Sequence, residues 1–266
     1  MAVEQEGSRV RRSGGGMSAR LGKFPWWLAI ILAIIAYMIV QVVVDPLYRR
    51  IFNTIWQGLG TTLYVTVVSF VFALALGLVL GLCRLSKNLL LRNGAIAYIE
   101  FIRGVPILVL IFAISYAVVP YLSRVFGLPN NAISLTTRAI IALVLIYAAY
   151  IAEVVRAGIE SIGPGQMEAA RSLGLSHVQA MVTVILPQAV RNVLPALGND
   201  LIALLKDTSL VSVLGVREIT QVARLSVSTT FQYEETYFIL TFFYLTLTLL
   251  LSLLLQWMQR RVGAGR

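Results

Sequence analysis

Six long apolar runs dominate the chain, and polar or basic stretches separate them. Four runs carry no charge, and the other two carry a few charged residues each. A helix needs about 20 mostly apolar residues to cross the hydrocarbon core of a bilayer. It also satisfies its backbone hydrogen bonds internally, as lipid requires. The pattern therefore predicts six membrane-spanning helices, at residues 26–44, 59–83, 104–123, 139–158, 193–216 and 237–258.

Composition supports an all-α integral membrane protein. The 266 residues are 58% hydrophobic and 13% charged, whereas a soluble domain carries about 25% charged residues. A single cysteine, Cys83, excludes an internal disulfide and a thiolate metal cluster. A single histidine, His177, has no histidine partner. We therefore expect no metal, no catalytic residue and no cofactor bound by this chain.

The distribution of basic residues predicts the orientation. The net charge of +10 is explained by basic cytoplasmic loops, so we expect no nucleic acid partner. With both termini in the cytoplasm, 15 lysines and arginines fall inside, six fall outside and Lys206 lies within a span. Residues 1–24, rich in Gly, Ser and Arg, are predicted to be a disordered cytoplasmic tail. Residues 259–266 form a second, short cytoplasmic tail.

The loop at 160–192 is long for a connection in a helix bundle, and long structured loops tend to be functional. Pro164 is predicted to open one short helix and Gly174 to end it in a left-handed conformation. Ser176 and Gln179 fit a capping box for a second helix, which Pro187 is expected to stop. The small Ala and Leu face of the first helix favours docking into another protein's groove over lying on the lipid surface.

Two features within the spans have alternative interpretations. Gly77 and Gly81 form a GxxxG pattern that allows close helix approach, either within the subunit or at a dimer seam. Glu153 and Arg156 are spaced to pair on one helix face. This pair fits a gate near the cytoplasmic end of a translocation pathway, or a purely structural ion pair.

The fifth span gathers polar and small residues on one side. At about 100° per residue, they fall in a wedge of roughly 120°, with leucines over much of the remaining surface. Charges that face lipid are costly, so we expect the wedge to face the bundle interior or a wet cavity. It lines a solute pathway or forms a structural network within the subunit. The candidate pathway residues on it are Asn199, Asp200, Ala203, Lys206 and Asp207.

The 160–192 loop resembles the EAA loop of ATP-binding-cassette (ABC) importer permeases. Glu168-Ala169-Ala170, then Gly174, then Ile185-Leu186-Pro187 match that pattern with its spacing, and Val184 stands where Ile is commoner. The resemblance implies that this loop couples the permease to an ATPase. The residues that it assigns to coupling are Glu168, Ala169, Ala170, Leu173, Gly174 and Pro187.

Neighbouring segments resemble the permeases for polar amino acids. They include 152–159, 204–210 and Phe101-Ile102-Arg103-Gly104-Val105-Pro106. The resemblance covers about Gly58 to Met258 and implies the transmembrane fold of a type I ABC importer. Its five-helix permease core would occupy residues 57–258, and residues 25–46 would form an extra N-terminal transmembrane helix.

The resemblance also implies a mechanism and partners. The chain would be a non-catalytic permease subunit in a bacterial plasma (inner) membrane. A second permease subunit, identical or related, would complete the pathway. Two ATPase subunits would bind ATP and Mg²⁺, and an extracytoplasmic binding protein would deliver the amino acid. The chain itself lacks a phosphate-binding loop, because Gly22-Lys23 has the wrong surroundings.

Three other functions compete with this interpretation. An ABC permease for another small polar solute would share most of these motifs. A secondary transporter would be complete in one chain and would often show internal repeats, which the sequence does not show. A membrane-embedded enzyme would need a convergent set of catalytic side chains, which one histidine and one cysteine do not supply.

Overall fold

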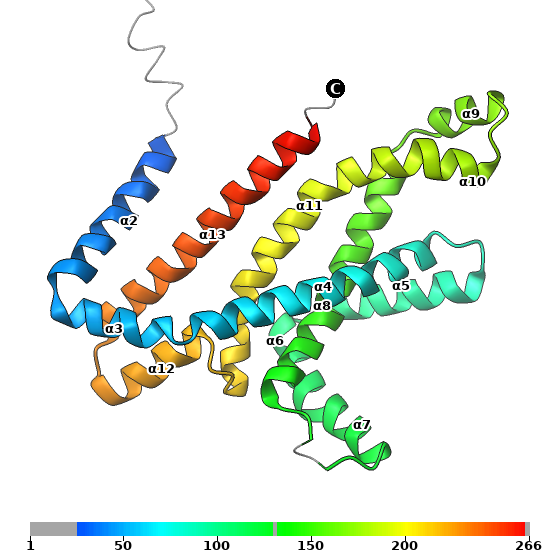
Figure 1. Ribbon diagram of the computed structural model, residues 1–266. Coiled ribbons are helices and arrows are strands. Elements are labelled where there is room, and N and C mark those ends of the chain that lie inside the picture. The colour runs from blue at the N-terminus through cyan, green and yellow to red at the C-terminus, as the bar shows by residue number, and fades with distance from the viewer. Residues whose placement is uncertain (1–25, 130–131, 264–266) are drawn as a thin grey trace, which may run out of the picture.

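The computed structural model describes residues 26–129 and 132–263, and over these residues the protein is built from helices alone (Figure 1). Six helical segments are long and apolar enough to cross a membrane, which confirms the predicted number of spans. Residues 1–24 and 264–266 of the two predicted tails lie outside the described residues. The elements are α2 (Trp26–Val44), α3 (Pro46–Trp56), α4 (Leu59–Arg84), α5 (Leu89–Gly104), α6 (Ile107–Phe112), η1 (Ala113–Val118), α7 (Val119–Val125), α8 (Leu135–Glu160), α9 (Pro164–Ser172), α10 (His177–Ala180), η2 (Met181–Ile185), α11 (Leu186–Asp207), η3 (Thr208–Leu214), α12 (Ile219–Thr230) and α13 (Tyr233–Gly263).

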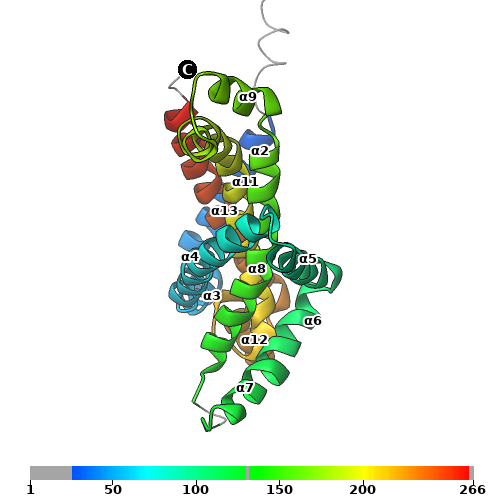
Figure 2. The same ribbon diagram turned by 90° about the vertical axis from the view of Figure 1, so that its right-hand side faces the viewer.

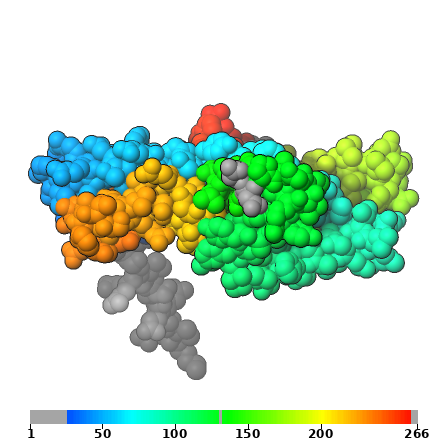
Figure 3. Space-filling model, turned by 90° about the horizontal axis from the view of Figure 1, so that it is seen from below, coloured from blue at the N-terminus to red at the C-terminus, as the bar shows by residue number. Residues whose placement is uncertain are grey.

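The bundle has two ends, which Figures 1 and 2 show from perpendicular directions. The start of α2, the end of α13 and the two short helices α9 and α10 lie at one end, which we call the loop end. Helices α3, α7 and α12 lie at the opposite end. Seen from that side, α12 lies beside α3 (Figure 3), and the two helices contact each other. The two described termini and the 160–192 loop therefore share one end of the molecule.

Helices α4 and α8 form the most extensive helix pair in the bundle. Two glycines of α4 allow their close approach, because a Cβ at Gly77 would lie 2.7 Å from Ile151 and one at Gly81 would lie 2.9 Å from Val155. The GxxxG pattern is thus used for packing within the subunit, as the first of its two interpretations required. Helix α8 is the most buried of the spans.

Three helices, α3, α5 and α12, were not predicted from the sequence. Helix α3 begins at Pro46, where the Asp45 side chain caps it by accepting a 2.7 Å hydrogen bond from the Leu47 N–H. Helix α5 begins after Asn88, whose side chain accepts from the N–H groups of Leu90 and Leu91. It ends before Pro106, and α6, η1 and α7 then form the third span. That span therefore begins at residue 107 in place of the predicted 104.

The prediction that Pro187 stops the second loop helix is wrong. The helical path continues from α10 through η2 into α11, with Pro187 in the first turn of α11. A proline lacks an N–H and clashes with the carbonyl four residues earlier. The wider π turn of η2 absorbs both effects. The same arrangement recurs at Pro120, which follows the π turn η1, so the two spans use one device.

Candidate functional site

The loop end presents α9 and α10 as a compact helical corner. Gly174 has φ +86° and reverses the chain between them, as predicted. Ser176 and Gln179 form the predicted capping box of α10. Ala170 is buried beneath the corner, and its small side chain lets α9 lie close to the segment that follows. The corner is therefore held by local sequence signals together with alanine packing.

The outer surface of this corner carries large apolar side chains that are exposed in the described part of the chain. Leu173 is 84% exposed and Val178 is 69% exposed. Ala169 and Glu168 are also exposed, and the Glu168 carboxylate has no hydrogen-bond or ion-pair partner among the described residues. Exposed apolar side chains on a rigid helical corner are typical of a docking surface for another protein. Pro187 is exposed farther along, at the start of α11.

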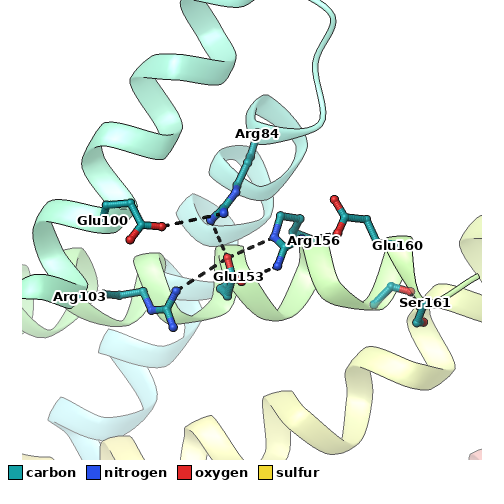
Figure 4. A network of polar contacts seen from close by, with 8 residues as sticks. Arg84, Glu100, Arg103, Glu153, Arg156, Glu160 and Ser161 are labelled. Carbon is teal, nitrogen blue, oxygen red and sulfur yellow. Dashed lines mark hydrogen bonds and ion pairs between the residues drawn. The ribbon is translucent and has the colours of Figure 1, made fainter.

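A charged cluster joins α4, α5 and α8, and Figure 4 shows it at close range. Its centre is Glu153, whose carboxylate accepts a 2.6 Å hydrogen bond from Arg84 and another of 2.6 Å from Arg156. Arg103 lies 3.9 Å from the same carboxylate. Glu100 and Glu160 complete the cluster through Arg84 and Arg156. Three arginines thus balance three glutamates, which lowers the cost of placing charge at the edge of a membrane.

Glu153 and Arg156 do not share a site with the polar wedge of α11. Tyr147 and Gly158 of α8 both contact α11, the first through Asp207 and the second through Val193. At about 100° per residue, these two α8 positions lie on one face, and Glu153 points about 120° away from Tyr147. The structure therefore separates the two groups of predicted pathway residues.

The polar wedge itself is divided by α8. Asp207 turns inward, where its carboxylate accepts a 2.8 Å hydrogen bond from the hydroxyl of the buried Tyr147. Asp200 also turns partly inward. In contrast, Asn199, Ala203 and Lys206 are exposed on the surface of the single chain. The leucines that were expected to surround the wedge include Leu204 and Leu205, which are buried inside the bundle.

Lys206 opens into a cavity of about 410 Å³ between α11 and α13. Helix α13 contributes the hydroxyl-bearing residues Thr241, Tyr244 and Thr248 to its lining. These three positions share one face of α13 because they are spaced by three and four residues. The hydroxyls of Thr241 and Thr248 donate to backbone carbonyls of α13, and that of Tyr244 donates to Glu218. The Lys206 ammonium is therefore the group that would meet a solute carboxylate.

One buried carboxylate was missed by sequence reasoning. Glu218 is fully buried and caps α12, accepting 2.8 Å and 2.7 Å hydrogen bonds from the N–H groups of Thr220 and Gln221. The Tyr244 hydroxyl donates to it at 3.1 Å. Burial raises the pKa of Glu218 to about 7, although these hydrogen bonds partly oppose the shift. Glu218 stands directly before the short amphipathic stretch that forms α12, and this position was the sequence signal that could have identified it as a helix cap.

Comparison with known proteins identifies the family. Residues 73–264 match the model of the binding-protein-dependent transport system inner membrane component. The chain belongs to this family. It is therefore a multi-pass inner-membrane permease subunit of an ABC importer, a system that works with an ATPase and a binding protein.

Individual relatives agree with the family match. The probable glutamine ABC transporter permease protein GlnM of Bacillus subtilis is 39% identical over 62% of this chain and 73% of its own length. The probable amino-acid permease protein YxeN of the same organism is 42% identical over 62% and 72%. A crystal structure of an amino acid ABC transporter with histidines is 39% identical, with a TM-score of 0.71 over 79% of this chain and 94% of that chain. The type I importer fold is thereby confirmed.

Proposed function

We propose that this chain and a second permease subunit, identical or related, form the membrane pathway for a polar amino acid. An extracytoplasmic binding protein delivers the amino acid, and two ATPase subunits that bind ATP and Mg²⁺ drive the cycle. This chain carries no catalytic residue and binds no cofactor. Relatives whose names specify an amino acid or glutamine support this substrate class.

The exposure of polar and small residues on one face of α11 is the main support for the proposed pathway. Asn199, Ala203 and Lys206 are polar or small, lie on a membrane-spanning segment and yet are exposed on the surface of the single chain. A lysine that faces lipid costs about 2.5–3.5 kcal/mol on insertion scales. A second subunit facing this surface would remove that cost by enclosing a wet path. Lys206 then contributes to recognition of the substrate carboxylate or to gating.

The remaining predicted residues take separate roles in this proposal. Asp207 supports the pathway from behind through its hydrogen bond with Tyr147 on α8, and Asp200 turns partly inward beside it on α11. Glu153 and Arg156 belong to the charged cluster, which connects α4 and α5 to α8, the helix that leads into the loop. The exposed corner with Glu168, Ala169 and Leu173 receives an ATPase subunit.

The orientation follows from the same proposal. The loop end is cytoplasmic, because ATPase subunits work where ATP is present. Both described ends of the chain lie at the loop end, so both termini are cytoplasmic. This agrees with the excess of basic residues expected on that side.

Cysteine labelling tests the pathway. In a Cys83→Ser background, single cysteines at Asn199, Ala203 and Lys206 should react with a small water-soluble thiol reagent in the assembled transporter. A cysteine at the buried Leu205 should stay protected. A cysteine at Ile34, which is exposed on the extra helix, should also stay protected because lipid covers it.

The second part of this experiment compares labelling at rest with labelling during the transport cycle. Substrate-loaded binding protein and ATP should lower labelling at the three α11 positions, because alternating access changes the exposure of a central path. Equal labelling at Ala203 and Leu205, or no labelling at either, would show that α11 lines no pathway and that Lys206 is structural.

A further inference from the structure

A groove with an almost entirely apolar lining lies between the extra N-terminal helix and the permease core; Thr246 is its one hydroxyl-bearing residue. The volume of the groove is about 370 Å³. Helix α2 contributes Ile39 and Val43, α3 contributes Phe52 and Trp56, and α13 contributes Leu250 to its walls. Both α2 and α13 qualify as membrane spans, so the groove opens toward the hydrocarbon region of the bilayer.

The groove exists because α2 packs loosely on the core. Met38 is the one buried residue of this 19-residue helix. Helix α2 is joined to the bundle mainly at its end, where α3 turns beneath it and Phe52 stacks on Phe243 of α13 at 4.8 Å. The two spans therefore enclose a space that neither fills.

The size and lining of the groove select its occupant. One turn of helix with its side chains is 5.4 Å long and 10–12 Å wide, or roughly 400 Å³ or more, so a partner helix does not fit within it. The hydroxyl of Thr246 is buried and not exposed to the groove, so a water molecule there would lack the two or more polar partners that it needs. If the groove were empty, the side chains that line it would lose their dispersion contacts. A single flexible hydrocarbon chain fits both the volume and the chemistry.

A positive charge stands at one mouth of the groove. The Arg49 guanidinium donates hydrogen bonds to the carbonyls of Val42 and Val43, the last turn of α2, and both valines line the groove. A guanidinium has five N–H donors, and Arg49 makes no ion pair within residues 26–129 and 132–263. Its remaining donors suit a phosphate. We infer that this groove binds one acyl chain of a membrane phospholipid whose phosphate lies at Arg49. This inference does not depend on the proposed transport function.

Native mass spectrometry of the full-length protein, purified in mild detergent with mixed phosphatidylethanolamine and phosphatidylglycerol, tests the site. The wild-type protein should retain one phospholipid per chain. Ile39→Trp fills the groove and should lower the retained fraction at least fivefold. Ile34→Trp is the matched control, because Ile34 and Ile39 are both isoleucines of α2 with 49% exposure and Ile34 does not line the groove. Equal retention in the two variants, or none in the wild type, would overturn the inference.

The phosphate contact needs a separate comparison. The wild-type protein should retain phospholipid in preference to diacylglycerol, which lacks the phosphate, and Arg49→Gln should abolish that preference. If the preference survives in Arg49→Gln, the phosphate does not lie at Arg49.

A fluorescence measurement covers the case in which Ile39→Trp fails to fold. With Trp26, Trp27 and Trp257 replaced by Phe, Trp56 reports on the groove alone. Phospholipid with brominated chains should quench Trp56, and the quenching should persist after dilution into unbrominated lipid for longer than exchange at the open helix surface allows. Immediate recovery would mean that only freely exchanging lipid surrounds the helix, which contradicts a bound chain.

Discussion

Glu153 and Glu218 each connect helices that are distant in sequence, but the first is held by arginines and the second by neutral donors. Glu153 lies partly exposed among Arg84, Arg103 and Arg156. Glu218, at the opposite end, is fully buried with two backbone N–H groups and one tyrosine hydroxyl. Charged partners that are partly exposed can exchange with one another at small cost. A buried carboxylate with neutral donors depends on fixed geometry.

This difference assigns different mechanical roles to the two ends. The Glu153 cluster links α4 and α5 to α8, the helix that leads directly into the exposed α9–α10 corner. The Glu218 network fixes α12 against α13, and Thr62 of α4 accepts a 3.2 Å hydrogen bond from the next backbone N–H, that of Ile219. We therefore expect the loop end to rearrange during transport and the Glu218 network to move as one piece.

The largest effect is expected at the loop end, in Gly174→Asp. Gly174 has φ +86°, a left-handed conformation that Asp, like Asn, tolerates better than other side chains with a Cβ. The change also adds a negative charge to the proposed ATPase surface. We predict normal membrane insertion, at least a tenfold loss of uptake and weaker ATPase co-purification.

Two variants separate the causes of that loss. Gly174→Asn tolerates the left-handed conformation and adds no charge, so it should keep most activity. Gly94→Asp adds the same charge on α5, where a new Cβ meets no atom within 4 Å, and should behave like the wild type. Wild-type uptake in Gly174→Asp would contradict the role of the corner.

The pH dependence of stability tests the buried Glu218 network. The pKa of Glu218 is about 7 in the folded protein against an ordinary value of 4.5. The folded state therefore binds more protons than the unfolded state between these values. The contribution of Glu218 to the free energy of unfolding is therefore fully present below pH 4.5. It is lost as the pH rises through 7, and the loss is at most about 3 kcal/mol.

Thermal unfolding in detergent between pH 4.5 and 9 measures this contribution. Glu218→Gln keeps an acceptor for the cap but cannot ionise, so its melting temperature should change less with pH than that of the wild type. Identical pH profiles for the two proteins would show that Glu218 ionises normally.

The smallest effect is expected within the charged cluster. Because Glu153 has several arginine partners, Arg84→Gln leaves it paired with Arg156 at 2.6 Å. A double-mutant cycle of Arg84→Gln and Glu153→Gln should give a coupling energy of about 1–2 kcal/mol. A coupling energy near zero would reduce the cluster to independent surface charges.

The sequence predicted the features that depend on local patterns. Apolar runs gave the six spans, and Gly174, Ser176 and Gln179 gave the loop corner, because backbone conformation and capping are decided within a few residues. The GxxxG pattern indicated that close approach is possible, but its partner helix was left open. The two caps at Asp45 and Asn88 were also visible in the sequence, and giving them weight would have revealed α3 and α5.

Features that depend on distant residues could not be predicted. Arg84 and Glu153 are 69 positions apart, so no local pattern pairs them. The burial of Leu204 and Leu205 beside an exposed Lys206 depends on which face α8 covers. The prediction at Pro187 was wrong because a proline can either end a helix or follow a π turn within a continuing helix, and the sequence does not distinguish the two.

ATP-dependent uptake by a reconstituted transporter tests the central claim most directly. Proteoliposomes that contain this chain, its partner permease and the ATPase subunits would receive a radiolabelled polar amino acid and its binding protein. We predict uptake that requires enclosed or added ATP on the loop-end side and that stops when the ATPase or the binding protein is omitted. Uptake by this chain alone, driven by an ion gradient without ATP, would contradict the account and identify a secondary transporter.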